Sequence, residues 1–128
     1  MLCCSCEQIV EEFKTVNQFK KEVNKHVPDK SLGVIHKGKN GHLSIMVPDE
    51  FDHLKDDLEK HTIVVVLRKT DMDEFTEEAL KELTSNVIET TKLVFGSQIK
   101  QGQIIFSNKK GLSGFRMSSS NRIEFLVE

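Results

Sequence analysis

The stretch TIVVVL at Thr62–Leu67 decides the fold, because four β-branched apolar residues and a leucine follow one another without a polar interruption. A strand with one face in water alternates polar and apolar side chains, whereas a strand covered on both faces reads as a continuous apolar run. We therefore predict that residues 62–67 form the central strand of a sheet. We expect its odd-numbered residues to be fully buried, and Val64 and Val66 to be nearly so.

The rest of the chain has the size and composition of one globular domain. It has 128 residues, of which 38% are hydrophobic and 30% are charged, enough to bury a core unaided. No apolar run reaches the length of about 18 residues that a membrane-spanning helix needs. A basic segment followed by an apolar core, which marks a secretory signal, is also missing. We therefore expect a cytoplasmic protein whose cysteines are thiols.

The charges are unevenly divided along the chain. Residues 1–91 carry 12 Lys and Arg against 18 Asp and Glu, or −6, and residues 92–128 carry 6 against 2, or +4. The net charge of −2 exerts no general attraction on nucleic acid, which makes nucleic acid an unlikely partner. The plain interpretation of the asymmetry is that acids lie on solvated helix faces and bases on exposed hairpins.

The first half of the chain predicts a helix and a hairpin. Apolar residues at helical spacing predict an amphipathic helix over 8–26, which Pro28 ends because the residue before a proline is pushed out of the α region. The stripe of this helix is Ile9, Val10, Phe13, Val16, Phe19 and Val23. Strands at 32–37 and 42–47 flank an Asn-Gly turn at 38–41, which supplies the positive φ angles of a tight hairpin.

Two more helices are expected on either side of the central strand. Pro48 suits the first turn of a short helix that ends before His61. Its buried stripe would be Phe51, Leu54 and Leu58. A longer helix would begin with Thr70 as its cap and Asp73 three residues on, and would end at Gly96. After that, alternating patterns predict three strands, at 103–107, 112–117 and 122–127.

The predicted order is α-β-β-α-β-α-β-β-β. This order indicates the α+β class, with a mostly antiparallel sheet of about five or six strands and three helices packed on one face. The second face of the central strand would be covered by a helix or by a partner subunit, so a homodimer is possible. We expect residues 1–6 to form a flexible Cys-rich segment and residues 7–128 to form a single α+β domain.

Part of this pattern resembles a known family. Gly41-x-Leu43-x-Ile45, Asp49-Glu50-Phe51-x-x-Leu54 and the strand at 62–67 are similar in outline to ubiquitin-like PB1 domains, over residues 15–68. Those domains pair through an acidic cluster, whose place is taken here by Lys37, Lys39 and Asn40, and no hairpin precedes the first helix. The resemblance implies an α+β architecture and transfers no binding residues to this chain.

The cysteines Cys3, Cys4 and Cys6 are the sharpest local feature. Neighbouring cysteines place three ligands poorly around a tetrahedral zinc ion, and no second Cys pair follows, so we predict no metal site. Accessible cysteines at a chain end suit S-acylation with palmitate, and two acyl chains anchor a protein stably. Met1-Leu2-Cys3-Cys4 looks like the acylated N-terminus of neuromodulin. The alternative is an unmodified terminus, because the basic residues that follow in neuromodulin are replaced here by glutamates.

The segment 108–116 is the second candidate site. It combines Lys109, Lys110 and Arg116 with two glycines and a serine, a mixture found in phosphate-binding loops. The order of a Walker loop is missing, so the alternatives are an anion site, a nucleic-acid surface with Phe106 and Phe115 as stacking residues, or a solvated hairpin turn. We expect the three bases to lie close together and to suit an acidic protein partner.

The histidines form a weaker candidate. His36 and His42 flank the Asn-Gly hairpin and would sense pH or hold an anion if they faced each other. No motif places a nucleophile beside a base, and the many acids between residues 49 and 59 surround a short helix. We therefore expect a small intracellular protein-interaction module without a cofactor, such as an adaptor, regulator or inhibitor, with membrane tethering through the cysteines as a possibility. The alternative function is anion or nucleic-acid binding by the basic C-terminal hairpins.

Overall fold

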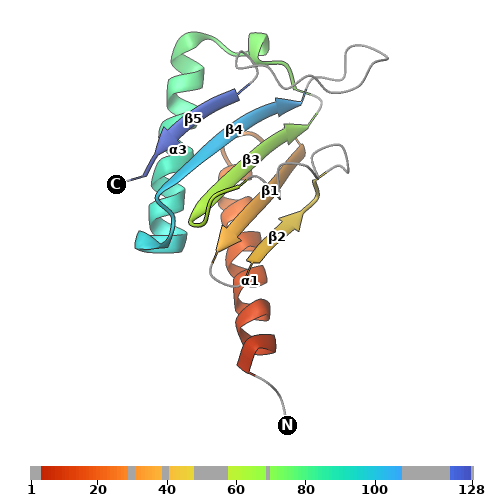
Figure 1. Cartoon of the computed structure of the whole chain (residues 1–128). Coiled ribbons are helices and arrows are strands. Elements are labelled where there is room, and N and C mark those ends of the chain that lie inside the picture. Colours follow the sequence, from red (N-terminus) through yellow and green to blue (C-terminus); the bar gives the residue numbers. More distant parts are fainter. Residues whose placement is uncertain are drawn as a thin grey trace.

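The computed structural model describes residues 4–28, 31–38, 41–47, 58–68, 70–107 and 122–127 (Figure 1). It consists of helices on one side of a five-stranded sheet. The elements, in chain order, are α1 (Cys4–Asn24), β1 (Ser31–Gly38), β2 (Gly41–Ile45), β3 (Thr62–Arg68), the 3-10 turn η2 (Met72–Glu74), α3 (Glu77–Phe95), the 3-10 turn η3 (Gly96–Gln98), β4 (Gln101–Ser107) and β5 (Arg122–Leu126).

The strand order is β2-β1-β3-β4-β5, so β3 lies in the middle of the sheet. The pairs β1–β2, β1–β3 and β4–β5 are antiparallel, and β3–β4 is parallel. A parallel pair needs a long crossover, and α3 supplies it. The α+β class and the mostly antiparallel sheet are confirmed. The described residues hold two α-helices rather than three, and the helix predicted from Pro48 and the strand predicted at 112–117 lie largely or wholly outside them.

Both α-helices pack on one face of the sheet (Figure 1). The rings of Phe19 from α1 and Phe95 from α3 meet with their centroids 5.6 Å apart. Ile63, Val65 and Leu67 of β3 point into this core, and each is 0% exposed, so the prediction of their full burial is confirmed. Other members of the core are Val16, Val23, Leu32, Val34, Leu83, Val87, Ile99, Ile104 and Phe106.

The opposite face of the sheet carries a second, smaller apolar cluster. Ile35, Val64, Val66 and Ile105 form it, together with Leu58 and the partly buried Val47. Val64 and Val66 are each 0% exposed. The prediction that the central strand is covered on both faces is therefore confirmed.

A change of backbone direction after β2 brings Val47 onto the sheet face that carries the smaller apolar cluster. The prediction of a strand over 42–47 is wrong at its end, because β2 ends at Ile45 and Met46 has a positive φ of 54°. Val47 therefore packs on the face opposite to the one that Ile45 contacts. Gly33 permits the crossing, since a Cβ there would lie 2.5 Å from the Met46 carbonyl oxygen.

The helix predicted to begin at Thr70 is interrupted. Asp71 starts η2 with a capping box. The Asp71 side chain accepts from the Asp73 N–H at 3.1 Å, and the Glu74 side chain accepts from the Asp71 N–H at 2.7 Å. Phe75 then returns to extended backbone. Thr76 caps α3 through the Ala79 N–H at 3.1 Å, so the long helix begins at Glu77. The predicted end at Gly96 is confirmed, with a φ of 63°.

α1 begins earlier than predicted. Its backbone is helical from Cys4, inside the segment expected to be flexible, and the helix ends at Asn24 rather than near residue 26. Figure 1 shows its N-terminal turns extending past the end of the sheet. Among the described residues, no helix is both long and apolar enough to cross a membrane.

Candidate functional site

The sequence-predicted site residues are only partly described. Cys4 and Cys6 lie in the first turn of α1, whereas Cys3 lies outside the described residues. Lys109, Lys110 and Arg116 also lie outside them. S-acylation of the cysteines and clustering of the three bases therefore stay predictions.

The two histidines of the first hairpin are not cross-strand partners. In the register of β1 and β2, His36 lies opposite Leu43, and His42 lies opposite Lys37. A directly opposed cross-strand pair of these two histidines is therefore wrong, and the side chain of His42 lies outside the described residues.

His36 is instead a core residue on the helix side of the sheet. It is 4% exposed, and its ring stacks on Phe95 with the centroids 5.0 Å apart. Its buried Nδ1 has no hydrogen-bond partner among the described residues. Burial, and secondarily the charge of His61, lowers the pKa of His36 from 6.5 to about 4. His36 is therefore neutral at physiological pH and makes the core sensitive to acid.

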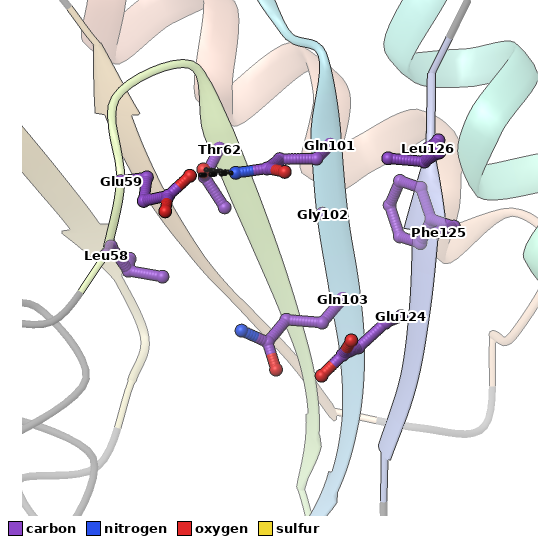
Figure 2. A pocket seen from close by; sticks show the side chains of 9 residues that line it. All are labelled: Leu58, Glu59, Thr62, Gln101, Gly102, Gln103, Glu124, Phe125 and Leu126. Carbon is purple, nitrogen blue, oxygen red and sulfur yellow. Dashed lines mark hydrogen bonds between the residues drawn. The ribbon is translucent and has the colours of Figure 1, made fainter.

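A polar cleft lies on the other face of the sheet, beside the smaller apolar cluster (Figure 2). It has a volume of about 400 Å³. Gln103 of β4 and Glu124 of β5 stand in the same cross-strand row as Val64 of β3, so they share its face. The full lining is Leu58, Glu59, Thr62, Gln101, Gly102, Gln103, Glu124, Phe125 and Leu126.

Hydrogen bonds hold one wall of the cleft in place. Figure 2 shows the Gln101 side chain directed toward Thr62 and Glu59. Its Nε2 donates to Glu59 Oε2 at 2.9 Å and to Thr62 Oγ1 at 3.3 Å. On the other side, the Glu124 carboxylate lies 3.4 Å from the Arg122 guanidinium. The buried Oε1 of Gln103 has no partner within the part of the chain that the structure describes.

The chemistry of the cleft favours a positively charged group. Glu59 and Glu124 contribute two carboxylates, and charged hydrogen bonds to carboxylates are stronger than neutral ones. Leu58 and Leu126 add apolar surface, and Leu126 is 69% exposed. A lysine or arginine side chain combines a long apolar stem with a charged end, so it matches both features. The described lining holds no cysteine, histidine or serine that would act as a nucleophile or base.

The sequence interpretation missed this cleft. The alternation of Gln101 and Gln103 along the strand was a visible signal that one of its faces is polar. Assembling the cleft also needs the parallel pairing of β3 with β4, which places Gln101 next to Thr62. No local pattern specifies that pairing.

No metal site emerges among the described residues. They contain no group of three or more His, Cys, Asp or Glu side chains arranged to hold an ion.

Comparison of the chain with protein-family models, with curated proteins and with solved structures finds no match. The resemblance of residues 15–68 to PB1 domains therefore gains no support from these comparisons.

Proposed function

We propose that this protein is a small protein-interaction module that receives a basic side chain of a partner protein in the cleft over β4 and β5. The observation that carries the proposal is the pair of carboxylates, Glu59 and Glu124, at a concave surface that Leu58 and Leu126 also line. Binding, rather than catalysis, is what this lining supports.

The geometry also supports a preorganised site. Glu59 belongs to no strand, but its carboxylate is held by Gln101, whose own position is fixed within β4. Holding an acceptor in place before binding reduces the entropy lost when a partner docks. The acidic partner expected for Lys109, Lys110 and Arg116 concerns a different surface and remains a separate prediction.

A titration with two matched peptides tests the proposal. An acetylated Gly-Arg-Gly amide carries the guanidinium, and the same peptide with citrulline keeps the shape and loses the charge. We expect the arginine peptide alone to shift the NMR signals of the Gln101 and Gln103 side-chain amides. Glu59→Lys should abolish the shift, and Glu59→Gln, which still accepts the bond from Gln101, should weaken it. Equal shifts with both peptides, or shifts that survive Glu59→Lys, would contradict the proposal.

A further inference from the structure

The outer edge of β5 carries backbone groups that point away from the sheet. The Val127 N–H donates to the Lys100 carbonyl at 2.8 Å, and Ile123 and Phe125 share its parity along the strand. In an antiparallel ladder, alternate residues bond to the same neighbour. The N–H and C=O groups of Arg122 and Glu124 therefore point away from β4. Among the described strands, β4 is the only neighbour of β5.

The side chains on this edge are complementary to their own copies. Arg122 and Glu124 lie two residues apart, so both project from the same face of β5. If two copies pair antiparallel with Ile123 on the two-fold axis, Arg122 of each copy lies opposite Glu124 of the other. A register shifted by one step, with Glu124 on the axis, would oppose two like charges. Opposite charges across a pair stabilise it and like charges destabilise it, so the first register is favoured.

The other face of the same edge carries a groove of about 450 Å³ between α3 and β5. Leu80, Ile88 and Ile123 contribute its apolar surface, and the polar residues of its lining are Glu77, Lys81, Thr84 and Ser85. Around a two-fold axis at Ile123, the grooves of two copies would face each other. The axis would therefore join apolar contacts on one face to ion pairs on the other, as a self-complementary interface requires.

We infer that β5 is a dimerisation strand, which pairs antiparallel with β5 of a second copy and joins the two sheets into one. The backbone groups of Arg122 and Glu124 supply the hydrogen bonds, and the alternating charges set the register. The dimer shares Glu124 with the cleft, but it does not rest on the proposed function. Its tests measure association and amide protection without a peptide, whereas the peptide test varies Glu59, so the two proposals can fail separately.

A charge-exchange experiment tests the dimer. Arg122→Glu and Glu124→Arg each place like charges across the interface, so each variant alone should be monomeric in analytical ultracentrifugation. The mixture of the two variants should form a heterodimer, because every cross-strand pair is then of opposite charge. The double variant should dimerise like the wild type. Within one chain, the Arg122–Glu124 contact joins a half-buried arginine to an exposed glutamate at 3.4 Å, and partly exposed ion pairs contribute little, so its loss should leave folding nearly unchanged.

Hydrogen exchange on the unaltered protein gives a second test that needs no variant. Protection of the Arg122 and Glu124 amides should rise with protein concentration. The Ile123 and Phe125 amides, which face β4, should be protected at every concentration and serve as the internal control. A wild-type protein that stays monomeric throughout the range, or single variants that dimerise as stably as the wild type, would overturn the inference.

Discussion

Acidification should destabilise the fold through His36. Its pKa is lowered to about 4 in the folded protein, whereas an unfolded histidine titrates near 6.5. The unfolded state therefore binds the proton first as the pH falls. The contribution of neutral His36 to the free energy of unfolding is fully present above about pH 6.5 and is lost progressively down to about pH 4.

The size of the effect follows from the two pKa values. Each pKa unit corresponds to about 1.4 kcal/mol, so the full loss is about 3 kcal/mol, and about 2 kcal/mol should be lost by about pH 5. Native domains have free energies of unfolding of only about 5–15 kcal/mol, so protonation of this single side chain would remove a large fraction of that free energy.

Urea unfolding followed by circular dichroism measures this loss, since the chain contains no Trp or Tyr for fluorescence. Because carboxylates also titrate in this range, the wild type must be compared with His36→Phe, which keeps a ring against Phe95. Between about pH 7.5 and about pH 5, the variant should lose about 2 kcal/mol less than the wild type. His26→Gln, at an exposed position, should follow the wild type. An equal loss in His36→Phe and the wild type would refute the reasoning.

Three further predictions concern the core, a chain crossing and the N-terminus. Val65→Asp buries an unpaired charge in the central strand and should cost several kcal/mol, about the whole stability of a small domain, whereas Leu93→Asp at a 78% exposed position should melt near the wild type. Gly33→Ala forces the crossing chain away and should lower the unfolding free energy by about 1–3 kcal/mol in urea titrations. If Cys3 and Cys4 carry thioester-linked acyl chains, the protein should fractionate with membranes until hydroxylamine releases it; unchanged fractionation, or free thiols in the N-terminal peptide mass, would contradict acylation.

The sequence predicted the elements whose signals are local. The unbroken apolar run of β3 indicated a strand buried on both faces, and the Asn-Gly turn indicated the hairpin in which Gly38 lies opposite Gly41. The start of α3 was missed because two capping signals overlap. Asp71 and Glu74 form a capping box for a separate turn, and the cap of the helix itself is Thr76.

The features that the sequence did not reveal depend on tertiary contacts. The reversal at Met46 uses a positive φ at a residue with no preference for it, so no propensity marks the position. The cleft gathers residues from three separate parts of the chain, and its assembly depends on the parallel register of β3 and β4. A helix between two strands indicates a crossover, but it does not specify which strands become neighbours.

The buried position of β3 also has a consequence for the unfolded chain. Six consecutive residues without a charge or a proline, and with high β propensity, have the composition of segments that stack into cross-β aggregates. In the native sheet, β1 and β4 pair with the two edges of β3, and apolar residues cover both faces of β3. Lys60, Arg68 and Lys69 flank the segment in the sequence, where charged residues act as gatekeepers against self-association. Any opening of the sheet exposes this aggregation-prone segment. Burial of β3 in the folded sheet therefore both organises the fold and protects the protein from aggregation.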